Sequence, residues 1–159
     1  MPVRKQSKPA PHPDGRKVRD VMTEDVECVE PDTTVKDAAQ KMRTLDIGAF
    51  PVCEGGDHVV GMVTDRDLTI RVLADARDAN QTKVRDVMSH SPVTLSQEDD
   101  VEKAETVMEE KQLRRLPVVD ASGKLVGLFS VGRVAKVEDD RRAGEVMKSV
   151  TQRRKTKVS

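Results

Sequence analysis

An internal repeat constrains this sequence more than any other feature, because a duplicated segment must build the same small unit twice. The pentapeptide Val18-Arg19-Asp20-Val21-Met22 recurs 66 residues later, without a gap, as Val84-Arg85-Asp86-Val87-Met88. Two copies of about 55–60 residues are too few for a solenoid, and they predict two units related by a pseudo-two-fold axis. Further matches at the same offset join Pro51 to Pro117, Gly61 to Gly127, and Thr64 to Ser130.

The two copies share one expected order of elements: strand, helix, strand, strand, helix. Apolar runs rich in β-branched residues predict the strands, and apolar residues at helical spacing predict the helices. The first copy has expected strands at 26–29, 49–53 and 59–63 and helices at 35–45 and 67–76. The second copy has expected strands at 93–95, 115–119 and 125–129 and helices at 101–111 and 132–137.

The repeat also sets the expected domain bounds. Residues 1–16 are rich in proline and basic residues, which predicts a disordered basic tail. The first unit is expected at 17–77, a polar linker at 78–82, and the second unit at 83–137. The remaining residues, 138–159, predict a helix over 143–150 and a frayed basic end.

Charge and aromatic content argue against several functions. Lys plus Arg number 28, as do Asp plus Glu, so no net field attracts polyanions. Phe50 and Phe129 are the only aromatic residues, whereas binding of single-stranded nucleic acid by stacking needs aromatic platforms. No apolar run approaches the roughly 20 residues that span a membrane. We therefore expect neither a membrane segment nor nucleic acid as a partner.

Cysteine and histidine usage predicts a cytoplasmic protein without a bound metal. Cys28 and Cys53 form no C-x-x-C pair, and no signal peptide opens the chain, so reduced thiols are expected. A disulfide between the two cysteines stays open as an alternative. His12, His58 and His90 are isolated from each other and from any cysteine pair, which favours surface histidines over metal ligands.

A hydroxyl and a carboxylate follow the third expected strand of the first copy. Thr64 stands where residues 59–63 pass into a helix, and Asp67 comes three residues later. Residues three apart lie on one helix face, so these side chains can converge on a pair of sugar hydroxyls. The same pattern is that of a capping box with Asp in the Glu position, and these residues alone favour capping.

The sequence contains no recognisable catalytic constellation. Asp65 and Asp67 are the closest candidate carboxylates, but alternate residues of one segment do not by themselves face a bond from two sides. No hydroxyl or thiol nucleophile has an evident general base, and no Gly-rich phosphate loop of the Walker type is present. We therefore predict that the protein is not an enzyme.

The doubled motifs resemble those of tandem CBS-domain proteins, or Bateman modules, and especially the stand-alone bacterial type. The resemblance extends over residues 18–137. It rests on Val-x-x-Val-Met, hydrophobic-Pro-Val and Val-Gly-hydrophobic-hydrophobic-Ser/Thr, each present twice in the same order. The family implies an α+β fold in which two pseudo-symmetric β-α-β-β-α units pack through their sheets and leave two clefts. It also implies an adenosine-containing ligand: AMP, ADP, ATP, S-adenosylmethionine or NAD.

The resemblance assigns a role to the hydroxyl and carboxylate described above. In this family the carboxylate of a Thr/Ser-x-x-Asp motif holds the ribose hydroxyls, which implies that role for Asp67 beside Thr64. The second copy keeps Ser130, but Arg133 stands where the aspartate is expected. A guanidinium has only donors and cannot accept from ribose hydroxyls. Either this cleft is empty, or Arg133 serves a phosphate, or it is a surface arginine.

The residues before the two Pro-Val strands also differ between the copies, but here it is the second copy that has the ligand-binding type of residue expected from the family. Gly48 and Ala49 are small and let a base approach the backbone, whereas Arg114 and Arg115 stand where family members often place phosphate-binding residues. We expect the first copy to bind adenosine and the two arginines to reach the phosphates across the cleft, unless they are strand-edge surface residues. The expected ligand-binding set is Thr64, Asp67, Val26, Gly48, Ala49, Phe50, Pro51, Arg114, Arg115, Leu116, Ser130 and Arg133.

These features together predict a regulatory module that senses an adenosine-containing nucleotide and needs no obligatory cofactor. The alternative is a protein-interaction or adapter module with degenerate nucleotide sites, which the arginine at position 133 favours. Family resemblance implies a disc-like homodimer, and the apolar face of 143–150 is a candidate for its interface. Output is expected through the conformation of the dimer or through an unidentified effector protein.

Overall fold

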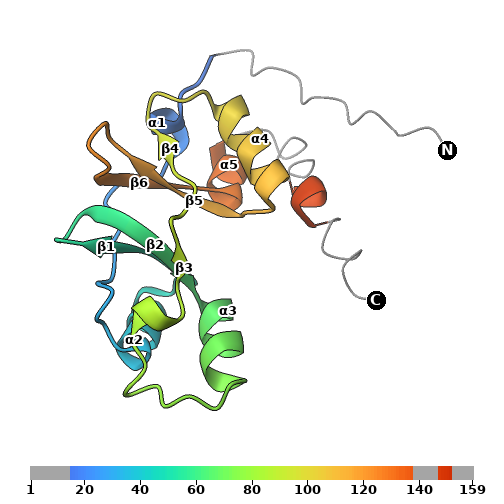
Figure 1. Cartoon of the computed structure of the whole chain (residues 1–159). Coiled ribbons are helices and arrows are strands. Elements are labelled where there is room, and N and C mark those ends of the chain that lie inside the picture. The colour runs from blue at the N-terminus through green and yellow to red at the C-terminus, as the bar shows by residue number, and fades with distance from the viewer. Residues whose placement is uncertain (1–14, 138–146, 152–159) are drawn as a thin grey trace.

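The structure is a computed structural model, and it describes residues 15–137 and 147–151. Two three-stranded sheets lie in the middle of the molecule, and helices cover the outer side of each sheet (Figure 1). The first sheet has the strand order β1-β2-β3 and the second has the order β4-β5-β6. This arrangement confirms the predicted α+β fold of two similar units packed through their sheets.

The elements of the second repeat follow the predicted order, and those of the first follow it except for its first strand. The first repeat contains α2 (Val35–Leu45), β1 (Ala49–Glu54), β2 (His58–Thr64), α3 (Asp65–Leu68) and the π-helix η1 (Thr69–Leu73). The second contains β4 (Leu95–Ser96), α4 (Val101–Lys111), β5 (Arg115–Val119), β6 (Leu125–Ser130) and α5 (Val131–Val137). The sequence did not predict three short elements: α1 (Val18–Val21), the 3-10 helix η2 (Val84–Asp86) and β3 (Ser89–His90).

The two long helices are confirmed with their predicted bounds. Thr34 Oγ1 accepts a hydrogen bond from the backbone N–H of Asp37 at 3.1 Å, and this bond caps the start of α2. Asp46 (φ 53°) ends α2 in the left-handed conformation, and Gln112 (φ 55°) ends α4 in the same way. Equal lengths and equal ends show that α2 and α4 are true counterparts.

The strand expected at 26–29 is reduced to one bridge at Val29. The N–H of Val29 donates to the carbonyl of Pro51 at 3.1 Å, and its own carbonyl accepts from Cys53 N at 3.0 Å. Asp25, just before the expected strand, has a left-handed backbone (φ 53°), which interrupts an extended run. Apolar composition alone did not reveal this interruption.

The helix expected at 67–76 starts earlier and changes type. It begins at Asp65 as α3 and continues from Thr69 as the π-helix η1. The hydroxyl of Thr69 donates to the carbonyl of Asp65 at 3.0 Å, while Ala74 N bonds to the carbonyl of Thr69 at 3.0 Å, five residues back. A threonine hydroxyl that competes for a helical carbonyl is a known source of such irregularity.

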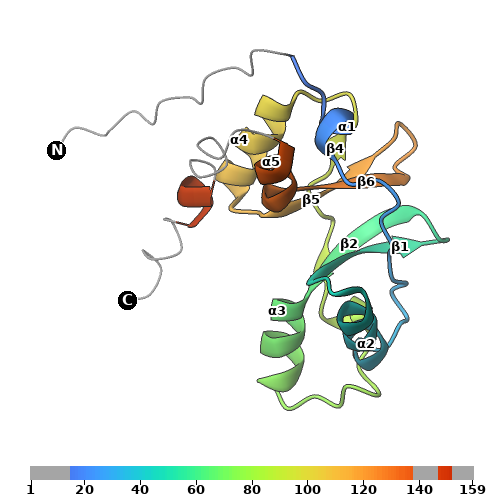
Figure 2. The ribbon, with the colours of Figure 1, turned by 180° about the vertical axis from the view of Figure 1, so that it is seen from behind.

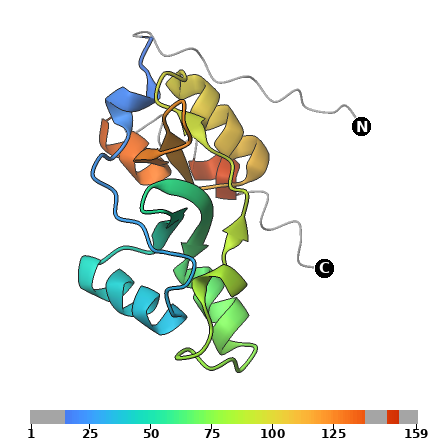
Figure 3. The same ribbon diagram turned by 60° about the vertical axis from the view of Figure 1, so that its left-hand side comes forward.

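The opening segments of the repeats are exchanged between the two sheets. Thr23, just after the first pentapeptide, bonds in both directions to Leu128 of β6, with both N–O distances 2.9 Å. The strand β3, just after the second pentapeptide, pairs antiparallel with β2 of the first repeat. Figure 2 shows α1 beside the second repeat, and Figure 3 follows the yellow-green chain upward from β3 to β4. Each repeat therefore completes the sheet of the other.

The hydrophobic cores show the same exchange. Phe50 and Phe129 are fully buried, one in each core. The expected domain bounds 17–77 and 83–137 stay predictions. They describe the sequence repeat, whereas each hydrophobic core contains residues from both units. The first core contains Val29, Val35, Ala38, Met42, Phe50, Val52, Val63 and Val72, joined by Val84, Val87 and Met88. The second contains Leu95, Val101, Ala104, Met108, Leu116, Val118, Phe129, Val131 and Val134, joined by Val18, Val21, Met22 and Val150.

The C-terminal part of the expected helix 143–150 is helical at residues 147–151, and 143–146 lie outside the described residues. Val150 is 1% exposed and belongs to the second core, whereas Met147 is 43% exposed. The predicted apolar face is thus partly used within the chain itself, and its role in a dimer interface stays a prediction.

Equivalent glycines allow the exchanged segments to approach. A Cβ atom on Gly61 would lie 2.8 Å from the carbonyl oxygen of Ser89, and one on Gly127 would lie 2.9 Å from that of Thr23. Both distances are shorter than ordinary carbon–oxygen contacts, and the obstacle is backbone that belongs to the partner strand. The glycine shared by both repeats is therefore required by close approach rather than by a turn.

Replacing Gly61 by alanine is expected to lower the free energy of unfolding by about 1–3 kcal/mol, because overpacking forces β2 and β3 apart. Urea unfolding followed by circular dichroism measures this loss. Gly132 of α5 is the matched control, since no atom lies within 4 Å of its added Cβ. Gly132→Ala is expected to be neutral or stabilising by up to about 1 kcal/mol. Equal destabilisation by both substitutions would contradict the argument from close approach.

Candidate functional site

A cavity of about 460 Å³ lies between the two repeats, where β2 passes into α3. Three segments enclose it: residues 62–67, the crossing segment 89–93, and residues 112–117 at the start of β5. Both repeats thus contribute to one site. The lining residues are Met62, Thr64, Asp65, Arg66, Asp67, Ser89, Pro92, Val93, Gln112, Leu113, Arg114, Arg115, Leu116 and Pro117.

Thr64 and Asp67 lie in this cavity and also cap α3. The backbone N–H of Thr64 donates to Asp67 Oδ2 at 2.9 Å, and Asp67 N donates to Thr64 Oγ1 at 3.1 Å. The capping interpretation is therefore confirmed. It leaves the hydroxyl hydrogen of Thr64 and the second carboxylate oxygen of Asp67 available, because each reciprocal bond uses only one acceptor. Capping holds both groups in place without using up their capacity for a ligand.

Arg71 ties Asp67 to the other repeat. Its Nη1 lies 3.8 Å from Asp67 Oδ1 and donates to the carbonyl of Val87 at 2.7 Å. The Asp67 side chain is only 15% exposed, whereas that of Arg71 is 47% exposed, so the carboxylate lies well inside the surface. The arginine both compensates the negative charge and connects it to the end of the second opening segment.

Three arginines supply positive charge to the cavity. Arg114 and Arg115 are exposed residues that lead into β5, and Arg66 is an exposed residue of α3. None of the three forms an ion pair with another residue of the described chain. Guanidinium groups with unused donors suit an anion, and phosphate above all. The cavity therefore combines a recessed carboxylate with unpaired cations.

The structure brings together five of the predicted site residues. Thr64 and Asp67 share the cavity with three residues of the second repeat: Arg114, Arg115 and Leu116. Leu116 is buried in the second core and forms part of the wall. Sequence reasoning missed the crossing segment 89–93, because only the exchange of opening segments carries it past this site. It also missed Arg66, which a search for cations beside the motif would have found.

Residues 48–51 and Val26 do not line this cavity. The carbonyl of Gly48 accepts from Asp65 N at 2.9 Å, and a Cβ at Gly48 would meet Asp65 Oδ2 at 2.9 Å, so the glycine packs against α3. Ala49, Phe50 and Pro51 are buried in β1, and Val26 is half-buried. The offset makes 48–51 the counterpart of 114–117, so these residues belong to the pseudo-symmetric position on the other side of the module.

Arg133 has a structural partner. Its Nε donates to the carbonyl of Val21 at 3.1 Å, and its backbone N–H donates to Ser130 Oγ at 3.2 Å. Val21 is the counterpart of Val87, so Arg133 contacts the first opening segment as Arg71 contacts the second. Neither Ser130 nor Arg133 lines the 460 Å³ cavity. The arginine at this position thus anchors an exchanged segment.

The buried Cys53 lacks the character of an activated nucleophile. Cys28 and Cys53 are both free thiols, as expected. Burial, reinforced by the neighbouring Cys28 thiol, raises the pKa of Cys53 to about 12. A thiol with so high a pKa stays protonated at neutral pH, whereas nucleophilic cysteines need a lowered pKa.

Within residues 15–137 and 147–151, no group of three or more His, Cys, Asp or Glu side chains is placed to hold a metal ion. None of the helices that the structure describes combines the length and the hydropathy of a membrane span.

Comparison with known proteins identifies the repeated unit. The family model of the CBS domain matches residues 18–74 and 84–140. The CBS domain-containing protein YhcV of Bacillus subtilis is 42% identical over 118 residues, which cover 74% of this chain and 82% of YhcV. The match to the protein MK0525 of Methanopyrus kandleri is 34% identical over 121 residues, and it spans only 62% of that protein.

Solved structures agree with this assignment. Hypoxic Response Protein I of Mycobacterium tuberculosis, crystallised with two coordinated zinc ions, is 35% identical with a TM-score of 0.71. That match covers 78% of this chain and 100% of the other. CBSX2 of Arabidopsis thaliana in complex with AMP is 32% identical with a TM-score of 0.68, covering 77% and 96%. With matches over both repeats, the chain belongs to the CBS-domain family as a tandem pair of CBS domains.

Proposed function

We propose that this CBS pair is a regulatory module that binds an adenosine-containing nucleotide between its repeats. The observation that carries the proposal is the single cavity in which Thr64 and Asp67 meet Arg114 and Arg115. Its volume of about 460 Å³ falls within the range of about 300–1,000 Å³ typical of small-molecule sites. The AMP complex of CBSX2, a relative with the same fold, supports this class of ligand.

Each part of the nucleotide has a chemically suitable neighbour. The available oxygen of Asp67 would accept from a ribose hydroxyl, and the hydroxyl of Thr64 would donate to the sugar. The guanidinium groups of Arg114 and Arg115 would bind phosphate oxygens. Apolar side chains from the crossing segment and from β5, Val93 and Leu116, would contact the base.

Binding at this position would be communicated through the fold. The cavity is enclosed by both repeats and by the crossing segment 89–93, so one ligand would contact every part that sets their relative position. A ligand that binds one arrangement better shifts the population toward it. We propose that a homodimer or an effector protein senses that shift.

A nucleotide is expected to raise the melting temperature of the purified protein. At 100 times its dissociation constant, a ligand adds about 2.7 kcal/mol to the free energy of unfolding. Thermal denaturation with AMP, ATP, NAD and S-adenosylmethionine at millimolar concentration measures the rise, and calorimetry is expected to show one nucleotide per chain.

Asp67→Asn is expected to remove most of the rise in melting temperature, because an amide keeps the capping acceptor but loses the charged acceptor for ribose.

The matched control is Asp75→Asn, which removes an exposed carboxylate outside the cavity and is expected to leave the nucleotide response unchanged. If no nucleotide shifts the melting temperature of the wild-type protein, the sensing proposal fails. The adapter function would then account better for the chain, and the bond from Arg133 to Val21 favours it by removing the second ribose-binding position.

A further inference from the structure

Two equivalent carbonyl groups of the chain are each held by an arginine. Arg71 Nη1 donates to the carbonyl of Val87 at 2.7 Å, and Arg133 Nε donates to the carbonyl of Val21 at 3.1 Å. Val21 and Val87 are counterparts at the 66-residue offset, and each is buried in the core that its opening segment completes. One guanidinium group therefore fastens each exchanged segment to the repeat that receives it.

The two arginines come from positions that are not equivalent. The offset makes Arg133 the counterpart of Asp67, whereas Arg71 is the counterpart of Val137. In the second repeat, the anchoring arginine thus takes the position of the carboxylate that is proposed to bind ribose. The first repeat keeps that carboxylate, and its anchor comes from one helical turn later. The first repeat therefore places a ribose-binding group and an anchor side by side.

Arg71 Nη1 is shared between two acceptors. It lies 2.7 Å from the carbonyl oxygen of Val87 and 3.8 Å from Asp67 Oδ1. The other carboxylate oxygen, Oδ2, accepts from the backbone N–H of Thr64, so Oδ1 is the oxygen that Arg71 and a ribose hydroxyl would both use. A hydroxyl that donates to Oδ1 satisfies this oxygen and leaves the guanidinium group to the carbonyl of Val87.

The helix that carries Arg71 also differs from its counterpart. The segment α3–η1 continues as a π-helix, whereas α5, which starts at the equivalent position, is an α-helix. The hydroxyl of Thr69 donates to the carbonyl of Asp65 at 3.0 Å, and the counterpart of Thr69 is Ala135, which has no hydroxyl. Short π-helical turns are frequent at functional sites. The irregular helix, the carboxylate and the shared arginine thus occur together in one repeat.

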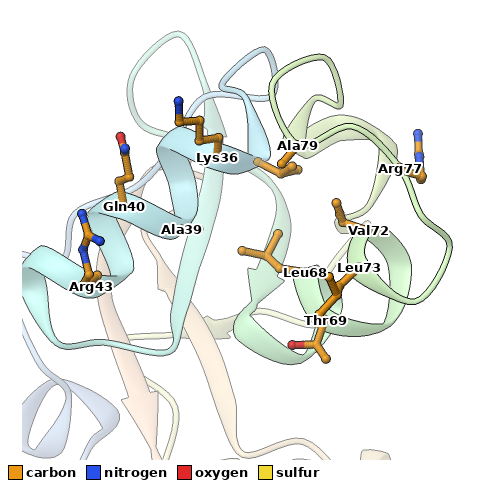
Figure 4. Close-up of a pocket in the computed structure, with 11 residues that line it drawn as sticks. Lys36, Ala39, Gln40, Arg43, Leu68, Thr69, Val72, Leu73, Arg77 and Ala79 are labelled. Atoms are coloured by element: carbon orange, nitrogen blue, oxygen red, sulfur yellow. The ribbon is translucent and has the colours of Figure 1, made fainter.

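The other side of this helix is fixed by packing. Figure 4 shows the segment α3–η1 beside α2, with Leu68 and Val72 lining the cavity of about 520 Å³ between them. Val72 is buried in the first core. Asp67 and Arg71 each precede one of these residues and form the adjacent row of the helix. The core therefore holds the helix, while the adjacent row connects the nucleotide cavity to the exchanged segment.

We propose that Arg71 is a positioning residue that couples nucleotide binding at Asp67 to the exchanged segment 84–91. The inference rests on the proposed nucleotide function and names the residue that transmits it. Val87 stands two residues before Ser89, where the chain begins to line the nucleotide cavity. A nucleotide that leaves Arg71 to Val87 therefore fixes the segment that encloses it. Because coupling is reciprocal, loss of the anchor also weakens the binding of the nucleotide.

Arg71→Ala is expected to weaken the binding of AMP and ATP roughly tenfold without changing the stoichiometry, as measured by calorimetry. Amide hydrogen exchange of residues 84–88 is the second readout, because none of them lines the cavity. Either nucleotide is expected to slow this exchange in the wild type but not in Arg71→Ala. The double variant Asp67→Asn/Arg71→Ala is expected to bind no more weakly than Asp67→Asn alone, because the arginine acts through that carboxylate.

Arg133→Ala is the matched control, because it removes the anchor of the other exchanged segment outside the nucleotide cavity. It is expected to leave the affinity and the exchange of residues 84–88 unchanged. Wild-type affinity and wild-type slowing of exchange in Arg71→Ala would overturn the inference while the proposed function stands. Equal losses in Arg71→Ala and Arg133→Ala would also overturn it, because they would reflect a general loosening of the fold. A wild-type chain that responds to no nucleotide would instead defeat the proposed function, and the inference with it.

Discussion

Replacing Arg114 and Arg115 together by alanine is expected to lower the affinity for ATP roughly 100-fold, while the affinity for adenosine stays unchanged. Hydrogen bonds to a charged group contribute about 1.5 kcal/mol or more each, and both arginines have unused donors beside the cavity. Adenosine has the sugar and the base but no phosphate, so it reports the remaining contacts. Isothermal titration calorimetry with the two ligands measures the difference.

Arg19→Ala is the matched control for this experiment. Arg19 is an exposed residue of α1 whose ion pair with Glu98 lies outside the cavity. Removing an exposed ion pair costs little, so neither affinity is expected to change. An equal loss for ATP and adenosine in the double alanine variant would mean that the arginines shape the cavity rather than bind phosphate. No loss for either ligand would remove them from the site.

Local sequence patterns predicted the elements that depend on local interactions. The bounds of α2 and α4 followed from apolar spacing, because this pattern acts within a few residues. The exchange of opening segments depends on contacts between residues far apart, such as Thr23 with Leu128. The repeat signalled two units, but an identical pentapeptide in each copy cannot show which core receives it. Packing decides that question.

The candidate site, too, has one part that depends on local interactions and another that depends on contacts between residues far apart in the sequence. The Thr64–Asp67 pair was visible in the sequence because a capping box spans only three residues. Its partners Arg114 and Arg115 come from the other repeat, and only the family resemblance suggested that they face the same cleft. Residues 48–51 were expected to line the same site as Thr64, yet none of them lines its cavity. Ala49 of β1 pairs directly with Thr64 of β2, but Ala49 is buried in its strand whereas Thr64 lines the cavity.

Phe50→Ala is expected to lower the free energy of unfolding by about 3–5 kcal/mol, the usual cost of deleting a buried aromatic side chain. The loss should appear in a single transition that involves both repeats. Phe50 lies in the first core, which Val84 and Met88 complete, while the second core is completed by the opening segment of the first repeat. Neither repeat can therefore unfold and leave the other core intact. Chemical denaturation followed at several wavelengths measures both the size and the cooperativity of the change.

Leu45→Ala provides the matched control, because this leucine is 39% exposed and belongs to neither core. Its truncation is expected to cost less than about 1 kcal/mol. If Phe50→Ala instead produced two separate transitions, with the second repeat unfolding as in the wild type, the repeats would be independent and the exchange would carry no energetic weight. A single shifted transition means that a change at one core reaches the other core. A cavity enclosed by both repeats needs such coupling in order to transmit the presence of its ligand.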